Sequence, residues 1–499
     1  MNAQLMMALM PILVLSLTAV VLMIQASVKR DQSVAWVITA LGLLLALWGA
    51  GYARGFTQPV TVLLMVDDWG LFFTTLILVA ALVTLILSKD TFSSEGERKE
   101  EYYLLLVLSV LGAVVLIQSS HMVSLLLGME LMGVALYAMI AFPEKGQRPL
   151  EAAIKYLVLS ACASVILLYG FALIYAATGE LSYAGIGLKA SIAYAQNPIL
   201  LMAGTAMVLA GIGFKLSVVP FHMWTPDVYE GAPTPVTGFL ATVSKGAVFV
   251  ALTRFFVEGQ LYEYQSLMTA LAAVAIASML IGNWLALRQE NIKRLLAYSS
   301  IAHFGYLLVV LIALSYSGAE AGLIRESITF YLAAYILTTL AAFAVVASIA
   351  GENERKNHIA SFDGLFWRRP IQAFSLTVAM LSFAGIPLTA GFIGKFYIIS
   401  VGIQSQLWWL ITALVIGSAI GIYYYLRIIF AMTMSSGMSS GMSSGMSSGM
   451  SVNDEGEDQK NVAQDVVVSS QDVLAMLLLT MVLLLGTWPQ PFIEFAGRL

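Results

Sequence analysis

The chain alternates long hydrophobic runs with short polar turns from one end to the other. A helix that crosses a membrane needs about 20 apolar residues. By that rule fourteen spans are predicted, near residues 5–26, 33–53, 69–88, 102–118, 121–142, 151–177, 199–220, 236–256, 266–287, 295–314, 324–350, 371–400, 405–430 and 472–489. The turn between the fourth and fifth spans is the weakest boundary because it carries no fixed charge. The pattern predicts an all-α polytopic membrane protein.

Composition agrees with the pattern and removes several classes of protein. Of 499 residues, 60% are hydrophobic and 11% charged, whereas a soluble domain averages about 25% charged residues. The single cysteine, Cys162, excludes an intrachain disulfide and an all-cysteine metal or iron–sulfur site. It lies in an apolar run, so we expect a buried side chain. No basic residue precedes the first hydrophobic run, which therefore predicts a transmembrane helix and not a cleaved signal peptide.

The placement of Lys and Arg predicts how the spans are oriented. Fifteen basic residues fall on one side of the predicted spans: Lys29, Arg30, Lys89, Arg98, Lys99, Lys145, Arg148, Arg288, Lys293, Arg294, Arg355, Lys356, Arg368, Arg369 and Lys460. The other side carries five: Arg54, Lys189, Arg254, Arg325 and Arg498. Loops rich in Lys and Arg stay in the cytoplasm, so the first set is expected to be cytoplasmic and both termini to face outward.

Five segments follow from this count. An N-terminal three-helix segment (1–101) precedes two five-helix units (102–256 and 266–430). A low-complexity segment (431–471), with four MSSG repeats and an acidic stretch, is expected to be a flexible cytoplasmic linker. A last transmembrane helix occupies 472–499. Because each unit has an odd number of spans, the two units would insert with opposite orientations, a recurring plan in transporters.

The fourth span of each unit is predicted to be broken. In the first unit Lys215 precedes Pro220, and a short loop carrying His222, Trp224, Asp227 and Glu230 is expected after the break. In the second unit Gly385-Ile386-Pro387 precedes Lys395, in a segment too long and too glycine-rich for one straight helix. Non-helical backbone at membrane depth is tolerated only inside protein or beside a cavity, and matched broken helices indicate a transport site. A simple proline kink is the structural alternative.

Lysines inside the spans are the main candidates for chemistry. Lys245 has about eight apolar or small residues on each side, which places it too deep for its ammonium to reach the headgroups. Lys215 lies nearer a break, where snorkelling is conceivable. An ionisable group at membrane depth is expensive and indicates function. We interpret both lysines as proton-carrying groups.

Glu130 lies near the centre of the fifth span with no charged neighbour on its own helix. A lone buried carboxylate would become neutral, whereas pairing with a buried lysine would keep both groups charged. Lys215 is the expected partner, and separating the two would encourage Lys215 to release its proton. A static pair that joins two helices is the alternative.

Other polar groups are less decisive. Lys155, near the start of the sixth span, could carry protons or only snorkel. His222 could relay protons or be a hydrogen-bonded loop residue. His303, with Tyr298 and Ser299, places a polar patch in the tenth span that could hold water or pack helices. No metal, phosphate-loop, nucleophile or nucleic-acid motif occurs, so no cofactor is expected in this chain.

Two stretches, KLSVVPFHMWTPDVYEGAPTPVTGFLATVSKGA and NIKRLLAYSSIAHFGYLL, resemble the antiporter-like membrane subunits of respiratory complex I. The resemblance covers nearly all of the membrane part, although the MSSG segment is no feature of the family. It implies fourteen helices with two inverted five-helix repeats, in a bacterial inner membrane beside other membrane subunits of the complex. It also implies proton translocation coupled to quinone reduction elsewhere, with NADH, FMN, iron–sulfur clusters and quinone bound by other subunits.

The family's functional residues fall on matching positions of this chain: Glu130, Lys155, Lys215, Lys245 and Lys395. The implied path takes protons in near Lys215, along Lys245 and out by Lys395, with the Glu130–Lys215 pair as its gate. A subunit of a multisubunit sodium/proton antiporter and a structural membrane spacer remain as alternatives. The first shares the ancestral fold; in the second, removing charge at Glu130 or Lys215 would be silent.

Overall fold

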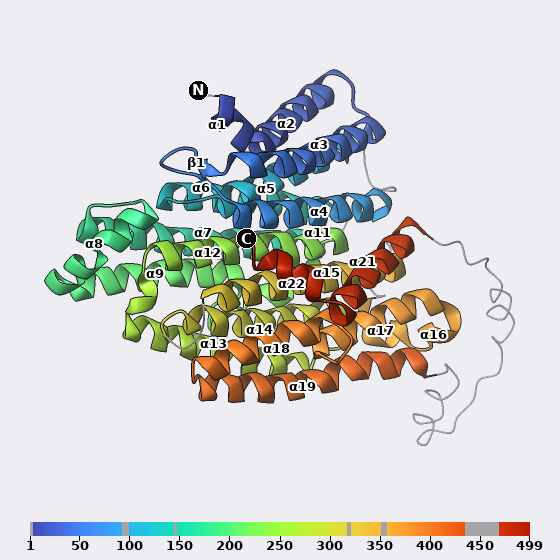
Figure 1. Ribbon diagram of the computed structural model, residues 1–499. Helices are drawn as coiled ribbons and strands as arrows, with labels where there is room; N and C mark the ends of the chain where they lie inside the picture. The colour runs from blue at the N-terminus through green and yellow to red at the C-terminus, as the bar shows by residue number, and fades with distance from the viewer. Residues whose placement is uncertain (1–2, 92–98, 144–146, 317–320, 351–356, 435–468) are drawn as a thin grey trace, which may run out of the picture.

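The computed structural model describes residues 3–91, 99–143, 147–316, 321–350, 357–434 and 469–499. Within these ranges the chain is almost entirely helical, and its long helices lie side by side (Figure 1). The long helices are α2 (Met10–Val28), α3 (Gln32–Ala53), α4 (Asp68–Thr91), α5 (Lys99–Ile117), α6 (Met122–Ile140), α7 (Gln147–Thr178), α9 (Pro198–Leu216), α12 (Lys245–Glu258), α13 (Gln265–Ala286), α14 (Ile292–Ala313), α15 (Ala321–Ala350), α17 (Pro370–Ala384), α18 (Ala390–Gln404), α19 (Trp408–Thr433) and α21 (Ser470–Thr487). Shorter helices are α1 (Ala3–Ala8), α8 (Tyr183–Gln196), α10 (Trp224–Gly231), α11 (Thr234–Phe239), α16 (Leu365–Arg368) and α22 (Gln490–Ala496).

Thirteen helices in the described part of the chain are long and apolar enough to cross a membrane. They match thirteen of the fourteen predicted spans, including those on either side of the uncertain turn between α5 and α6. The remaining span, 371–400, is made by α17 and α18, two apolar helices of 15 residues each. The all-α polytopic fold is therefore confirmed. The predicted linker falls mostly in residues 435–468, which lie outside the described residues.

Both predicted breaks are present, although the first differs in detail. Helix α9 ends at Leu216, and Ser217 follows in the left-handed conformation with φ 63°. Helix α17 ends in the same way at Gly385, with φ 80°. The expected loop after the first break is wrong in part, because Trp224 begins the helix α10. Pro226 does not prevent this helix, since a proline in the first turn removes no intrahelical hydrogen bond.

The eighth span contains an irregularity that its composition does not show. Helices α11 and α12 join into one continuous helix, Thr234–Glu258, through the π-helical turn η2 (Leu240–Ser244). A π-turn inside an α-helix accommodates one extra residue and occurs often at functional sites. Lys245 is the first residue after this turn. The turn therefore helps to decide which side of the helix carries the lysine.

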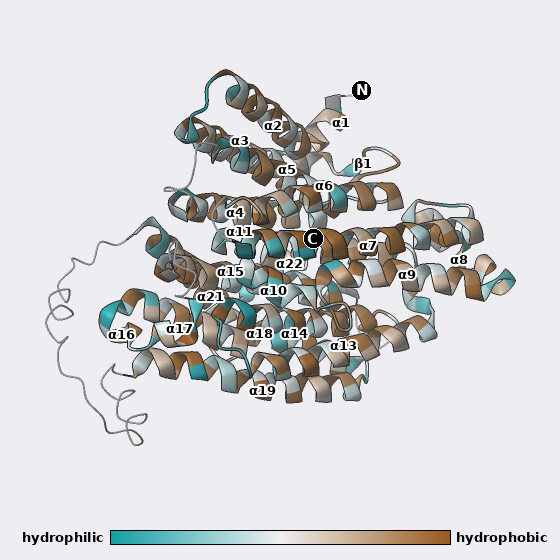
Figure 2. Cartoon of the chain, turned by 180° about the vertical axis from the view of Figure 1, so that it is seen from behind, coloured by the Kyte–Doolittle hydropathy of each residue, from teal (hydrophilic) through white to brown (hydrophobic). Residues whose placement is uncertain are grey.

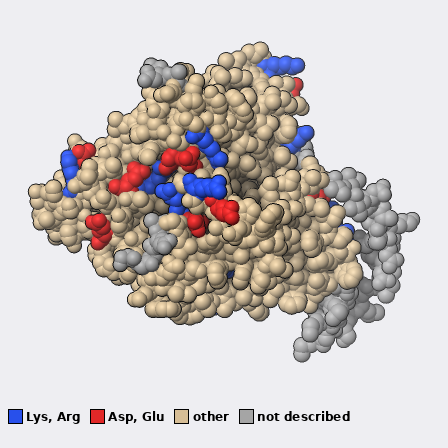
Figure 3. Space-filling view, viewed as in Figure 1, with Lys and Arg blue, Asp and Glu red and all other residues tan. Residues whose placement is uncertain are grey.

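Two elements form the centre of the molecule, the helix Thr234–Glu258 and α14, and both are buried on nearly all sides. The outer helices are predominantly hydrophobic on their exposed surfaces (Figure 2). Most of the face in Figure 3 is uncharged, and the largest group of its charged side chains lies near the middle of that face. Such a surface suits contact with lipid or with other membrane helices.

Close helix contacts depend on small residues. Gly170 of α7 faces Gly204 of α9, where an added Cβ would lie 2.7 Å from the Gly204 carbonyl oxygen. Gly112 and Gly128 hold α5 and α6 together in the same way. Membrane helices associate by such packing because lipid provides no hydrophobic driving force between them.

The expectation that the Cys162 side chain is buried is wrong. Cys162 is exposed on the outer face of α7, because this face has no neighbour within the chain.

Strands are a minor part of the fold. β1 (Gln58–Pro59) pairs antiparallel with β2 (Met65–Val66) in the connection between α3 and α4. Single turns of 3-10 helix occur at η1 (Arg54–Phe56), η3 (Leu261–Glu263) and η5 (Ile359–Phe362). These elements lie at the ends of the long helices and contribute nothing to the interior described below.

Candidate functional site

Lys215 lies in the last turn of α9, immediately before the first break, and its side chain is 2% exposed. Its ammonium donates a hydrogen bond of 2.7 Å to Ser160 Oγ on α7. Tyr137 of α6 donates to the same oxygen over 2.6 Å. A cation in the last turn of a helix is stabilised by the unsatisfied carbonyl groups and the negative end of the helix dipole. The broken helix thus offers the lysine a partial counter-charge.

Space for the Lys215 ammonium comes from a glycine. A Cβ at Gly133 of α6 would lie 3.1 Å from Lys215 Nζ and 3.1 Å from Tyr137 Oη. The rings of Tyr137 and Tyr156 complete the surroundings, with centroids 5.9 and 5.7 Å from the same nitrogen. A cation over an aromatic face is attracted to it, and more so away from water. Neutral groups therefore surround most of this charge.

The expected ion pair between Glu130 and Lys215 is not formed. No ion pair within 4.0 Å among the described residues joins them. Glu130 instead accepts a hydrogen bond of 2.5 Å from Ser164 of α7. Ser160 and Ser164 are one helical turn apart on α7, so that each serine holds one member of the expected pair. These hydroxyls could not be predicted from the sequence, because serine is also an ordinary packing residue in membrane helices.

Lys245 is fully buried. Its ammonium donates to Ser300 Oγ of α14 over 2.5 Å, and the rings of Tyr229 and Phe304 lie 5.4 and 5.5 Å from it. Like Lys215, it is held by one serine hydroxyl from a neighbouring helix and has no carboxylate within 4.0 Å in the described part of the chain. This is the second unpaired lysine in the interior.

Lys395 lies on α18, after the second break, and its side chain folds back across that break. The ammonium donates to the carbonyl oxygens of Phe383 and Ala384, over 3.0 and 2.9 Å. These carbonyls end α17 and have no helical partner, so the lysine caps that helix. A Cβ at Gly385 would lie 2.8 Å from Lys395 Cδ. Glycine at this position therefore allows both the left-handed turn and the lysine.

Helix α14 connects the surroundings of Lys245 with those of Lys395. Ser300 binds Lys245, and the Tyr306 ring lies 5.4 Å from Lys395 Nζ. Between them His303 shares a hydrogen bond of 2.6 Å with Tyr331, and a longer one of 3.3 Å with Tyr425. A cavity of about 10 Å³ lies against His303, Tyr331 and Tyr335, close to the minimum that holds one water.

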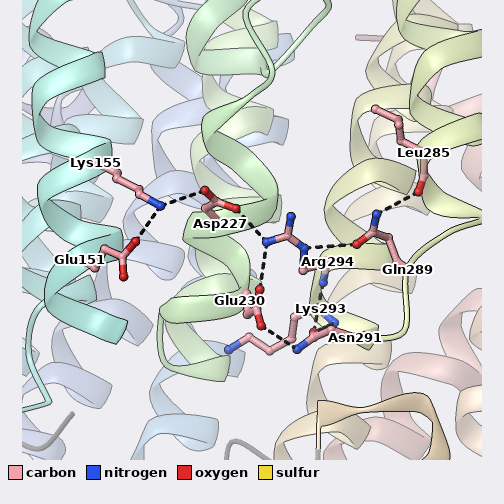
Figure 4. A network of polar contacts seen from close by, with 9 residues as sticks. All are labelled: Glu151, Lys155, Asp227, Glu230, Leu285, Gln289, Asn291, Lys293 and Arg294. Atoms are coloured by element: carbon pink, nitrogen blue, oxygen red, sulfur yellow. Dashed lines mark hydrogen bonds and ion pairs between the residues drawn. The ribbon is translucent and has the colours of Figure 1, made fainter. Parts of the chain in front are cut away.

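A charged vestibule opens between α7 and α10, on the side of Lys155. Its volume is about 160 Å³, and it is lined by Arg148, Glu151, Ala152, Lys155, Asp227, Glu230 and Gly231. Figure 4 shows Lys155 between Glu151 and Asp227, with Nζ–oxygen distances of 2.8 and 3.0 Å. Arg294 of α14 joins Asp227 and Glu230, at 2.8 and 2.9 Å. The charges on three helices thus form one network.

The network keeps Asp227 ionised. Burial alone would raise the pKa of Asp227, but its hydrogen bonds and its attraction to Arg294 and Lys155 outweigh burial and lower that pKa. Lys155 is 44% exposed, in contrast to the three interior lysines. The structure therefore places Lys155 in the vestibule and not in the interior.

His222 lies in the connection between α9 and α10. Its side chain is 6% exposed, and its ring lies against the Pro220 backbone, although neither ring nitrogen makes a hydrogen bond of good geometry within the described residues. Its role as a proton relay or as a hydrogen-bonded loop residue stays a prediction. A buried polar atom without a partner is unusual and is often satisfied by water.

Comparison with known proteins places this arrangement in a family. The family described as NADH:quinone oxidoreductase/Mrp antiporter, transmembrane, matches residues 119–421. NADH-quinone oxidoreductase subunit N of Methylococcus capsulatus is 46% identical over 436 residues, which cover 86% of this chain and 87% of the relative. The chain belongs to the NADH:quinone oxidoreductase/Mrp antiporter membrane-subunit family. Both broken helices and the three interior lysines lie within the matched residues.

Solved structures share the antiporter-like fold. A chain of respiratory complex I from Thermus thermophilus with bound aureothin is 30% identical with a TM-score of 0.79, covering 97% of this chain and 99% of that one. A chain of the Mrp complex from Dietzia sp. DQ12-45-1b has a TM-score of 0.83 at 18% identity, covering 100% and 97%. The second likeness shows the antiporter-like fold alone.

Proposed function

We propose that this chain is the proton-translocating subunit N of an NADH:quinone oxidoreductase and that its interior lysines carry the protons. Support for the subunit comes from the 46% identity with a subunit of that name. Support for the residues comes from burial: Lys215, Lys245 and Lys395 are at most 8% exposed. A buried ammonium without a carboxylate is costly, and such groups in membrane proteins mark ion and proton pathways.

The single observation that carries the proposal is the way in which these lysines are held. Each ammonium has only neutral partners, a serine hydroxyl or the carbonyls at the end of a broken helix. Neutral partners stabilise the protonated lysine only partly, so the proton is held loosely enough to move. A carboxylate in direct contact would hold it much more firmly.

The proposed path begins at Lys215, continues to Lys245 and ends at Lys395. Tyr229 of α10 lies beside Lys245, and Trp224 of the same helix donates a hydrogen bond to the Phe214 carbonyl of the broken helix that carries Lys215. Helix α14 provides Ser300, His303 and Tyr306 between Lys245 and Lys395. Glu130 would gate the first step by approaching Lys215 when Ser164 releases it. The arrangement in which Lys215 bonds Ser160 is then the separated state of this pair.

Lys155 and His222 have supporting roles in this proposal. Lys155 pairs with the carboxylates that line the vestibule, through which protons reach the Lys215 region. His222 relays protons through water near the first break. The NADH, FMN, iron–sulfur clusters and quinone of the complex would bind to other subunits. Among the described residues there is no group of three or more His, Cys, Asp or Glu side chains that could hold a metal ion.

The expected orientation belongs to the same proposal. Both termini would lie in the periplasm, and the vestibule, which lies at the end of the spans that carries Arg148 and Arg294, would open to the cytoplasm. The chain would lie in a bacterial inner membrane beside the other membrane subunits of the complex. Its lipid-facing surface would be the hydrophobic face of the outer helices.

The test measures protons pumped per NADH oxidised by the complete complex in proteoliposomes. Lys215→Ala, Lys245→Ala and Lys395→Ala should each lower this ratio while the complex still assembles. Lys189→Ala is the matched control, because this lysine is 49% exposed and pairs with Glu180 at 2.7 Å. An unchanged ratio in all three interior variants would contradict the proposal. A proton flux that requires sodium would favour the antiporter alternative instead.

A further inference from the structure

The vestibule is closed toward the interior by an aromatic layer. Along α7, Ala152 lines the vestibule, Tyr156 lies one turn deeper, and Ser160 holds Lys215 one turn beyond that. Four residues of α-helix rise about 6 Å, so Tyr156 lies midway between the vestibule and the lysine's partner. All three residues are on one face of α7 because they are spaced by four. A route from the vestibule to Lys215 along this face of α7 therefore passes Tyr156.

Helix α10 supplies the other half of the layer. It runs against α7 with Gly231 beside Ala152, Asp227 beside Lys155, and Trp224 beside Tyr156. The rings of Tyr156 and Trp224 are stacked, with centroids 4.5 Å apart and an interplanar angle of 24°. Their side chains are 0% and 2% exposed. The two rings therefore close the space between the helices at the Trp224 end of α10.

The aromatic layer also reaches the broken helix that carries the lysine. Trp224 Nε1 donates to the Phe214 carbonyl over 3.0 Å, and the Phe214 ring lies 5.4 Å from the indole. Lys215 Nζ is 5.7 Å from the Tyr156 ring on the other side. The Tyr156 hydroxyl is buried and has no hydrogen-bond partner in the described part of the chain. A buried hydroxyl without a protein partner is often satisfied by water. A site that water enters only at times would show such an unpaired hydroxyl whenever the water is absent.

We propose that Tyr156 and Trp224 form a gate between the charged vestibule and Lys215, and that water must pass this pair before the lysine can take up a proton from the vestibule. The inference deepens the proposed function and rests on it for its purpose, whereas the stacked and buried ring pair is observed in the structure. Asp227 and Lys155 act as positioning residues: their ion pair ties α10 to α7 one turn from the aromatic pair. Separation of the two helices would part the rings.

The test follows water access to Ser160 in the complete complex. Ser160→Cys in a Cys162→Ala background gives this chain one thiol, behind the gate. A membrane-impermeant methanethiosulfonate reagent is applied to right-side-out and inverted vesicles, and its attachment to this chain is measured by mass spectrometry. We expect slow reaction with the native pair. Trp224→Ala should raise the rate at least tenfold, and only when the reagent is on the vestibule side.

Two further variants separate the gate from helix stability. Trp224→Phe keeps an aromatic plug but loses the hydrogen bond to Phe214, so the labelling rate should stay within twofold of the native rate. Tyr156→Leu keeps apolar volume but removes the ring stack, and decides the test if Trp224→Ala fails to assemble. Trp284→Ala, which removes an indole 59% exposed at another surface, is the control for a lost tryptophan.

The outcomes distinguish the gate from the proposed function. Equal labelling rates in the native, Trp224→Ala and Tyr156→Leu chains, or rapid labelling of the native pair, would overturn the gate. The pumping ratio of Lys215→Ala is measured in parallel. Gated labelling together with an unchanged ratio in that variant would leave the gate in place and refute proton transfer at Lys215. If both hold, Trp224→Ala should also make the proteoliposomes leak protons in the absence of NADH.

Discussion

Ser300→Ala is the most direct test of how the interior lysines are stabilised. Ser300 is 2% exposed, and its oxygen accepts the one hydrogen bond that Lys245 Nζ makes in the described part of the chain. Removing a partner from a buried charged group costs about 1.5–3 kcal/mol. The cost falls on the protonated form of Lys245, because the neutral amine needs the hydrogen bond less. Every 1.4 kcal/mol is a factor of ten, so the ratio of protonated to neutral Lys245 falls by a factor of about ten to a hundred.

The assay is NADH-driven proton uptake by proteoliposomes that contain the complete complex. If protons pass over Lys245, the pumping rate should fall at least tenfold in Ser300→Ala, with assembly retained. Ser300→Thr keeps the hydroxyl and should recover most of the rate. Ser400→Ala is the matched control, since this serine lies on an exposed surface and bonds only its own helix. A native pumping rate in Ser300→Ala would refute the argument that this hydroxyl supports a proton-carrying lysine.

Three further predictions concern the second break and the vestibule. Lys395→Ala should insert and assemble, but should lower the protons pumped per NADH, measured as above. Gly385→Ala should lower the free energy of unfolding by about 1–2 kcal/mol, because alanine is strained in the left-handed conformation, and should therefore lower the melting temperature of the purified complex. Contact of the new Cβ with the Lys395 side chain should lower it further. Gly51→Ala in α3, where an added Cβ meets nothing within 4 Å, is the control and should not lower the melting temperature, because alanine favours a helix more than glycine does. Asp227→Asn should cost at most about 1 kcal/mol, because its pairs are partly exposed; a larger loss in a melting experiment would contradict that estimate.

Much of the architecture could be predicted because the thickness of a membrane sets a similar length for every apolar span. Lengths of apolar sequence set the fourteen spans, and Gly385 and Pro220 marked the two breaks. The boundaries and short elements were harder to predict. Residues 224–231 look like a loop because they combine two acidic side chains with a proline, yet packing against α7 and α14 makes them helical.

The charged residues of the site could be predicted from the sequence, whereas the neutral residues that bind them could not. Lys215 and Lys245 stand out because ammonium groups are rare in apolar runs. Ser160 and Ser300, which hold them, are each 55 residues away in sequence and belong to a residue type common in membrane helices. Glu130 and Lys215 are near enough for pairing to be a reasonable expectation. Local competition from two serines on α7 decides against a direct contact, and no single sequence shows such competition.

The turn η2 ends immediately before Lys245 and holds one residue more than the α-helical turn that would replace it. If the turn became plain α-helix with all its residues kept, the two halves of the helix would rotate by about 100° relative to each other. Lys245 and the N-terminal half would then no longer face their present neighbours together. Deleting one residue from Leu240–Ser244 would remove the surplus, and the helix could become regular with both halves close to their present orientation. Elsewhere in Thr234–Glu258 a deletion meets no such surplus and should turn the lysine away from Ser300.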